Sequence, residues 1–281
     1  MQNKSVLEKK DLSFKPVIND TPKSLSGEQI NFYNEKGYLK PLKIFSDAEV
    51  KENRDYFDYL LNLLNGKHKG DLAYAINGYH VQCEGIWDIV MDSRILDYVE
   101  DLIGPNIIAW GTHYFCKLPQ DQKIVPWHQD ASYWPISPSR TVTVWLAIDD
   151  VDTENAAMQF ISGTHKLGLL NWEKTEKPAV LKQEITNVTR YGKPVFNNLK
   201  AGEMSLHADM MVHGSTSNDS MRRRCGLTIR YCPPEVRVID NKQKNYAEQA
   251  ILCRGKNRYN HWTCHSRPQG NDLSSLIKNI E

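Results

Sequence analysis

Hydrophobic positions in the first third of the chain recur with a helical period. Three segments show this period, and each begins near a serine and ends at a glycine: residues 26–37, 46–66 and 93–104. Serine favours the N-cap position, and in the second segment Ser46 and Glu49 match a capping box. We therefore predict three helices here. Residues 1–24 are polar and aperiodic, and we expect them to form a loose arm.

From about residue 107 the pattern changes to short apolar or alternating runs bounded by Gly, Pro, Asp and Asn. The runs are 107–116, 141–148, 157–161, 203–206 and 225–232. Regular helices do not separate them, which favours an antiparallel all-β core over βαβ units. We predict a mainly β, jelly-roll core of about eight strands with the N-terminal helices flanking it. Residues 25–281 form one domain in this interpretation, and the polar stretch from about 234 forms a flap or tail.

Composition narrows the class of protein. The chain has 281 residues, 40% hydrophobic and 25% charged, and a formal charge of +1, which is ordinary globular usage. The densest basic cluster, Arg222–Arg224, is too short to predict nucleic-acid binding, and no run approaches the ~18 apolar residues of a membrane span. The first ten residues lack the apolar segment of a secretory signal. Six cysteines without a Cys-x-x-Cys pair indicate free thiols, so we expect a cytoplasmic protein. The sequence leaves its oligomeric state open.

The central chemical feature is the run Trp127-His128-Gln129-Asp130. Alternate residues of a strand point to the same side, so His128 and Asp130 can both reach one metal ion. A second histidine completes a two-His-one-carboxylate triad, which leaves coordination positions open. His213 lies 85 residues after His128, at the end of an apolar run. The spacing also allows His207 as third ligand, but it lacks the Gly-Ser and Arg that follow His213.

A candidate anion site follows the second histidine. Arg224 lies 11 residues after His213 and begins a strand-like run. Its planar guanidinium is suited to bidentate contact with a dicarboxylate. Ser215 can add a hydroxyl to the same carboxylate.

Together these motifs resemble the phytanoyl-CoA dioxygenase family. The resemblance covers roughly residues 28–235 and rests on four motifs: His128-Gln129-Asp130-Ala131-Ser132-Tyr133-Trp134, Thr143-Val144-Trp145-Leu146-Ala147-Ile148-Asp149, Phe160-Ile161-Ser162-Gly163-Thr164-His165, and His213-Gly214-Ser215 with Arg224 downstream. It implies a double-stranded β-helix, iron(II), O2, and oxidative decarboxylation of 2-oxoglutarate to succinate and CO2.

The same resemblance implies roles for single residues. His128, Asp130 and His213 match the iron ligands, and Arg224 and Ser215 match the partners of the distal carboxylate of 2-oxoglutarate. Further positions match residues that line the co-substrate or iron pocket: Gln129, Trp145 and His113. A partly buried structural histidine is the alternative for His113. Some chlorinating relatives have Gly or Ala where Asp130 stands, so we do not expect halogenation.

Candidate substrate-binding residues carry weaker signals. Tyr133 and Trp134 follow the metal motif and can shape the substrate mouth, or simply pack. Arg230 shares a strand face with Arg224, so it can bind a substrate carboxylate or form a salt bridge. Three further candidates alternate along a polar stretch that can equally be a solvated loop: Asn77, His80 and Gln82.

The leading hypothesis is an iron- and 2-oxoglutarate-dependent hydroxylase of a small polar substrate, amino-acid-like or from secondary metabolism. An acyl-CoA substrate is less favoured, because the sequence shows neither a basic surface for its phosphates nor an apolar tunnel. The alternatives are an oxidative cyclase or desaturase with the same iron chemistry, and a non-catalytic jelly-roll binding protein. His261, Cys264 and His265 suggest a zinc site, but three such groups in a polar tail are weak support.

Overall fold

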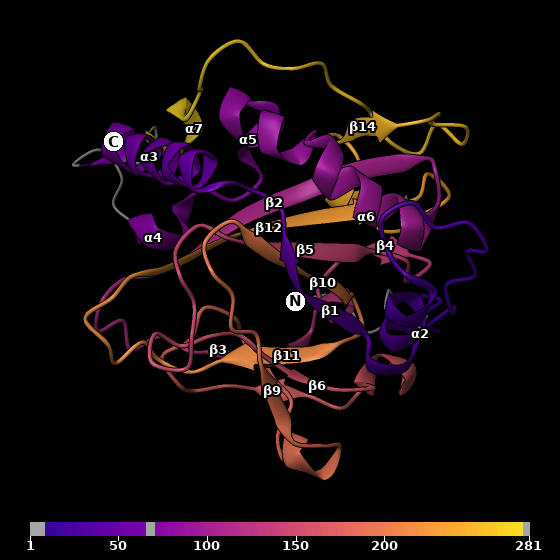
Figure 1. Cartoon of the computed structure of the whole chain (residues 1–281), viewed down its shortest axis with the longest axis horizontal. Helices are drawn as coiled ribbons and strands as arrows, with labels where there is room; N and C mark the ends of the chain where they lie inside the picture. The colour runs from indigo at the N-terminus through magenta and orange to yellow at the C-terminus, as the bar shows by residue number, and fades with distance from the viewer. Residues whose placement is uncertain (1–8, 66–70, 278–281) are drawn as a thin grey trace.

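The computed structural model describes residues 9–65 and 71–277. Two antiparallel sheets face each other, as Figure 1 shows. The larger has the strand order β1 (Tyr38–Lys43), β10 (Glu203–Ala208), β5 (Val142–Ala147), β12 (Arg224–Cys232), β2 (Ile107–Lys117) and β14 (Ile251–Arg254). The smaller has the order β3 (Val125–Gln129), β11 (Val212–Ser215), β6 (Gln159–Ile161) and β9 (Pro194–Phe196). This arrangement confirms the predicted jelly roll.

Helices cover the outer face of the larger sheet (Figure 1). They are α2 (Gly27–Lys36), α3 (Asp47–Leu64), α4 (Leu72–Ala75), α5 (Glu84–Val90) and α6 (Ser93–Ile103). The three predicted helices are α2, α3 and α6. Ser26 and Ser46 each form the N-terminal hydrogen bonds of a capping box, whereas Asp92 rather than Ser93 caps α6.

Strand alternation divides the larger sheet into an apolar and a chemical face. On β12 the odd-numbered residues Cys225, Leu227 and Ile229 are fully buried in the core under the helices. The even-numbered Arg224, Thr228 and Arg230 point instead into the space between the two sheets. Burial of the odd face therefore fixes which side chains of β12 reach the site.

The sequence does not predict β1, because Pro41 interrupts its apolar run. The remaining short elements are β4 (Ile136–Ser137), β13 (Arg237–Val238), β7 (Glu173–Lys174), β8 (Gln183–Glu184), α7 (Ser274–Ile277) and five 3-10 turns, among them η2 (Asp130–Ser132) and η5 (Asn241–Tyr246). In the described residues no helix combines the length and hydrophobicity that crossing a bilayer requires.

Residues 9–24 of the predicted arm contain no helix or strand, but they are attached to the domain. Lys10 Nζ donates to the carbonyl of Ala131 at 2.6 Å, and the Ser139 amide donates to the carbonyl of Asp11 at 2.8 Å. This part of the arm therefore runs along the domain surface beside the segment that follows the candidate metal motif.

Candidate active site

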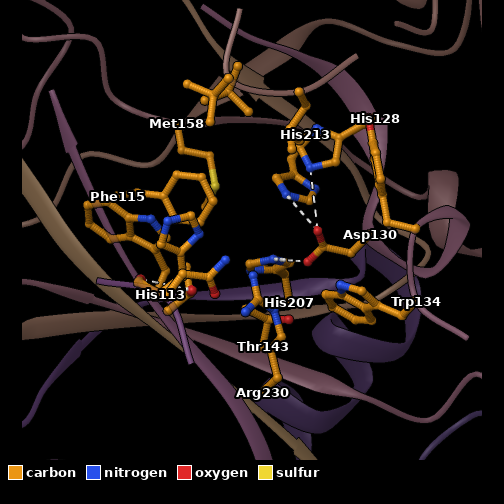
Figure 2. Close-up of a pocket in the computed structure, with 18 of the residues that line it drawn as sticks. His113, Phe115, His128, Asp130, Trp134, Thr143, Met158, His207, His213 and Arg230 are labelled. Atoms are coloured by element: carbon orange, nitrogen blue, oxygen red, sulfur yellow. Dashed lines mark hydrogen bonds and ion pairs between the residues drawn. The ribbon is translucent and has the colours of Figure 1, made fainter. Parts of the chain in front are cut away.

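The side chains of the three predicted metal ligands lie close together beside the smaller sheet, where they line the cavity. His128 on β3 and His213 on β11 are direct partners across neighbouring strands. Asp130 is the first residue of η2, one step past the end of β3, so the turn rather than a continuing strand aims its carboxylate. One ligand atom from each residue lies within 4.8 Å of the other two (Figure 2). The register of two strands thus assembles residues 85 positions apart.

Backbone carbonyls orient both imidazoles. His128 Nδ1 lies 2.7 Å from the carbonyl oxygen of Pro126, and His213 Nδ1 lies 2.9 Å from that of Met211. Each Nδ1 therefore carries the proton, and each Nε2 presents its lone pair to the cavity. The Nε2 atoms lie 3.4 and 3.9 Å from Asp130 Oδ1. Two imidazole nitrogens and one carboxylate fit the donor preference of iron(II) and leave one face of the ion open.

Burial and charge hold these groups in their metal-binding protonation states. Burial raises the pKa of Asp130, but the contacts with His128 and His213 and the charge of Arg230 lower it more, so that it lies far below its ordinary value. Burial also lowers the pKa of His213 well below its usual range. An ionised carboxylate and a neutral imidazole are the forms that bind a cation.

His207, the other histidine that the spacing allows, lies on the opposite sheet. It belongs to β10, and its Nε2 is 3.9 Å from Asp130 Oδ2. It is not in the group of three ligand atoms. Both of its ring nitrogens are buried without a hydrogen-bond partner, and burial lowers its pKa to about 4. His207 therefore stands beside the metal site as a neutral, unpaired imidazole.

Arg224 is a buried cation at one end of the cavity. Its Nη2 donates to Ser215 Oγ at 3.0 Å, and its guanidinium carbon lies 5.7 Å from the ring centre of Trp145. The side chain is 2% exposed, and its Nε has no partner. Among the described residues no carboxylate pairs with it, and burial lowers its pKa. A buried guanidinium in this state fits one carboxylate of a dicarboxylate ligand.

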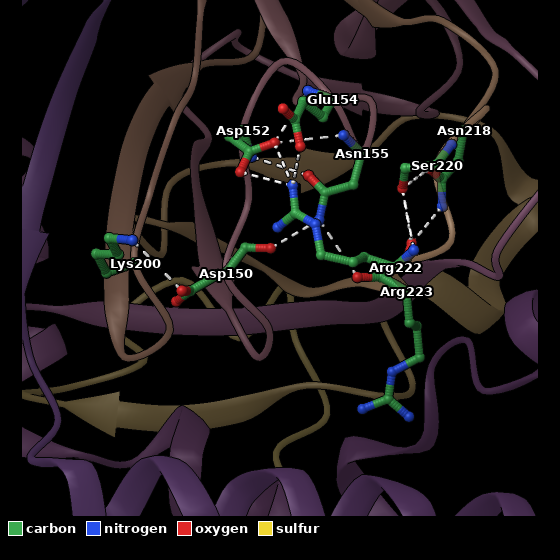
Figure 3. A network of polar contacts seen from close by, with 9 residues as sticks. All are labelled: Asp150, Asp152, Glu154, Asn155, Lys200, Asn218, Ser220, Arg222 and Arg223. Carbon is green, nitrogen blue, oxygen red and sulfur yellow. Dashed lines mark hydrogen bonds and ion pairs between the residues drawn. The ribbon is translucent and has the colours of Figure 1, made fainter.

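The residues before Arg224 are clamped by ion pairs (Figure 3). Arg222 Nη2 donates to both carboxylate oxygens of Asp152 at 2.8 Å. Arg223 makes a bidentate contact with Asp149 at 2.8 and 3.0 Å, and the Asp149 carboxylate also accepts from the Cys225 amide at 3.1 Å. These pairs fix the start of β12 on both sides of Arg224. They also show that two of the three clustered arginines are engaged with carboxylates of this chain.

Two residues later on β12, Gly226 makes room for Trp145. A Cβ at this position would lie 2.2 Å from Cζ2 of the indole ring. The absence of a side chain lets the indole lie flat across β12, where it contacts the Arg224 guanidinium. Gly226 is therefore needed for close approach rather than for an unusual backbone angle.

The ligands and Arg224 line one cavity of about 510 Å³ between the sheets. Other predicted residues that line it are Ser215, Trp145, His113, Tyr133, Trp134, Arg230 and Asn77. His113 also bonds through Nε2 to the carbonyl of Tyr74 at 3.0 Å, and burial lowers its pKa to about 3. His113 therefore lines the cavity and also makes a structural hydrogen bond to the backbone.

Three predicted site residues do not reach the cavity. Gln129 points to the opposite side of β3 from its neighbours, and its amide is used by the backbone of Gly168, Leu170 and Met210. The His80 ring is buried between the Gln249 carbonyl, at 2.6 Å, and Thr112 Oγ1, at 3.2 Å. Gln82 is not among the lining residues either. The prediction for Gln129 ignored the alternation that it applied to His128 and Asp130.

Sequence reasoning missed several lining residues, among them Trp110, Thr143, Tyr246 and Gln249. Trp110 and Thr143 are in predicted strands, and only the register between strands reveals that they face the site. Tyr246 and Gln249 come from the C-terminal stretch, beyond the matched motifs. The suggested zinc group does not form, because within the described ranges the one cluster of three metal-binding side chains is His128, Asp130 and His213.

Comparisons with known proteins agree with this site. The sequence profile of phytanoyl-CoA dioxygenase matches residues 33–226. The peroxisomal phytanoyl-CoA dioxygenase of Bos taurus is 26% identical over 256 residues, which cover 81% of this chain and 75% of that protein. A probable alpha-ketoglutarate-dependent hypophosphite dioxygenase of Stutzerimonas stutzeri is 26% identical over 223 residues, covering 73% of this chain and 77% of its own length.

The fold is also similar to that of CytC3 solved with Fe(II) and alpha-ketoglutarate. The TM-score is 0.65 at 22% identity, over 89% of this chain and 100% of that one. Fold, site and relatives together define an iron(II)- and 2-oxoglutarate-dependent dioxygenase. The chain belongs to the phytanoyl-CoA dioxygenase family.

Proposed function

We propose that this enzyme hydroxylates a small polar substrate, amino-acid-like or from secondary metabolism, with release of succinate and CO2. The observation that carries the proposal is the arrangement of charged and polar groups in one cavity between the sheets. The triad His128, Asp130 and His213 stands between a buried cation, Arg224, at one end and a polar and aromatic chamber at the other.

In this proposal one set of cavity residues holds the metal ion and another holds the co-substrate. His128, Asp130 and His213 hold iron(II), and Arg224 with Ser215 holds the distal carboxylate of 2-oxoglutarate. Bound iron(II) and 2-oxoglutarate supply the oxidation of a substrate C–H bond by O2. Trp145, Met158 and Phe115 line the cavity around Arg224 and exclude water from the charged pair.

The lining of the other end supports a small polar substrate. Asn77, Thr143, Tyr246 and Gln249 present amide and hydroxyl groups to the cavity. An acyl chain requires a long apolar tunnel, whereas the described lining of this chamber mixes amide and hydroxyl groups with aromatic rings. A small polar substrate is also supported by the Stutzerimonas relative, which is named as a probable hypophosphite dioxygenase. No feature of the cavity favours oxidative cyclisation or desaturation over hydroxylation.

The test is an anaerobic titration of the protein with iron(II) and then 2-oxoglutarate, followed by the visible charge-transfer band of the chelate. We expect the band in the wild-type protein. His128→Ala should abolish it, since two ligands do not hold the ion in place, and His261→Ala in the C-terminal tail is the matched control.

Turnover then tests the substrate class. Succinate formation that depends on free amino acids or similar small compounds, with a product carrying one added oxygen atom, supports the proposal. A product that has lost two hydrogen atoms indicates desaturation or cyclisation instead. Turnover of acyl-CoA thioesters alone contradicts the proposed substrate class, and a wild-type protein without the band contradicts the assignment of the co-substrate.

A further inference from the structure

The end of the cavity opposite Arg224 contains a second, unpaired cation. Arg230 lies six residues further along β12, on the same face, and its side chain is largely buried. Its guanidinium carbon lies 5.9 Å from the ring centre of Trp110 and 5.2 Å from that of Trp134. These contacts fix the group without neutralising it. Its Nε has no hydrogen-bond partner, and among the described residues no carboxylate lies at ion-pair distance, although the charge of Asp130 acts on it across the cavity.

Register places further polar groups beside Arg230. His207, Thr143 and Arg230 are partners across the three neighbouring strands β10, β5 and β12, so they form one row across the cavity face. Figure 2 shows these three side chains together on the side of the cavity that faces Asp130. Trp110 contributes its indole from β2, the next strand of the sheet.

All four members of this cluster have buried polar atoms without a hydrogen-bond partner. These atoms are Arg230 Nε, Thr143 Oγ1, Trp110 Nε1 and both ring nitrogens of His207. Thr143 and His207 are each 1% exposed, and Trp110 is 3% exposed. A buried polar atom without a partner is costly, so five such atoms on four residues beside one cavity indicate a ligand that completes them.

The charge balance of the cavity defines the sign of that ligand. Among the described residues that line it, the charged groups at neutral pH are Asp130, Arg224 and Arg230. Iron(II) and the dianion of 2-oxoglutarate cancel each other in formal charge, and Asp130 cancels one arginine. One positive charge remains, and Arg224 is committed to the co-substrate. The cavity as a whole therefore keeps one positive charge, and Arg230 is the arginine that remains available to a substrate anion.

We infer that Arg230, Thr143, His207 and Trp110 form a subsite for a singly charged oxyanion group of the substrate, a carboxylate or a phosphonate. This inference rests on the proposed function and narrows its substrate class to anions. Arg230 supplies the charge and a planar pair of donors, and the indole and hydroxyl hydrogens supply two more. Neutral His207, near Asp130, contacts the part of the substrate closest to the metal.

The test uses the anaerobic complex of the protein with iron(II) and saturating 2-oxoglutarate. The probes are isobutyrate, methylphosphonate and the neutral isostere isobutyramide. Binding is followed by tryptophan fluorescence, since Trp110 and Trp134 flank Arg230, and by perturbation of the charge-transfer band. We expect isobutyrate or methylphosphonate to bind at least about tenfold more tightly than isobutyramide, because a charge-assisted pair replaces a neutral one. The anion that binds more tightly indicates whether the substrate group is a carboxylate or a phosphonate.

Arg230→Met should weaken anion binding about tenfold or more while the charge-transfer band of the 2-oxoglutarate complex remains. Arg190→Met, which removes an exposed arginine that does not line the cavity, should change neither. If Arg230→Met does not fold, Thr143→Val and Arg230→Lys serve instead, each with a smaller loss of anion affinity. Equal binding of the amide, no anion binding by the wild type, or wild-type anion affinity in the Arg230 variants overturns the inference. Absence of the band in the wild type overturns the proposed function instead, so the two failures are distinguishable.

Discussion

The two ends of the cavity are built differently. At the Arg224 end, side chains project from paired strands, and the ion pairs of Arg222 and Arg223 hold the start of β12 in place. At the Arg230 end, strands supply only one wall. Tyr133 and Trp134 follow η2, and Tyr246 and Gln249 belong to the stretch beyond β13. The Arg224 end is therefore lined mainly by strands, whereas loops complete the wall at the Arg230 end.

The sharpest way to separate the two ends is to remove one cation at a time. Arg224→Met should raise the KM for 2-oxoglutarate about 100-fold, since a buried charge-assisted pair is lost, and should leave iron binding unchanged. Steady-state kinetics and an iron titration measure both quantities. Arg190→Met is the matched control, because it removes an exposed arginine that neither lines the cavity nor supports β12. An unchanged KM in Arg224→Met would contradict the assignment of this end to the co-substrate.

A second substitution tests how tightly the side chains pack at the Arg224 end, where Gly226 on β12 lies against Trp145 on β5. Gly226→Ala places a Cβ against the Trp145 indole, which must move away from Arg224. We expect a loss of about 1–3 kcal/mol in the free energy of unfolding, together with weaker 2-oxoglutarate binding. Gly27→Ala is the control, since no atom lies within 4 Å of its added Cβ. Chemical denaturation compares the variants, and equal stability of both would mean that the indole adapts freely.

The smallest effect concerns the support of the Arg230 end. His80 forms a hydrogen bond with the carbonyl of Gln249, and burial lowers its pKa from 6.5 to about 4. The unfolded chain therefore binds a proton that the folded chain does not, between pH 6.5 and 4. Stability is retained above pH 6.5 and falls as the pH decreases, by on the order of 2 kcal/mol near pH 4.5 from this group. His80→Asn should flatten that part of the pH profile of the unfolding free energy. A profile identical to the wild type would exclude His80 as a source.

The metal motif shows how far sequence reasoning reaches. Strand alternation predicted that His128 and Asp130 share one side, and they do, although Asp130 is the first residue of the turn η2 and not part of β3. Gln129 follows the same rule and points away, yet the resemblance to the family placed it in the pocket. His80 and Gln82 alternate in the sequence, but they fall in and beside a short 3-10 turn, where a period of two has no meaning.

The sequence by itself determined the three longest helices, the apolar face of the predicted strands and the type of metal site, because caps, periodicity and ligand chemistry are local properties. Only the tertiary structure decided which residues share the cavity. The pairing of β10, β5, β12 and β2 brings His207, Thr143, Arg230 and Trp110 together from segments up to 120 residues apart, the separation of Trp110 and Arg230 in the sequence. Register between distant strands follows from burying the whole apolar face at once, and no short segment contains that information.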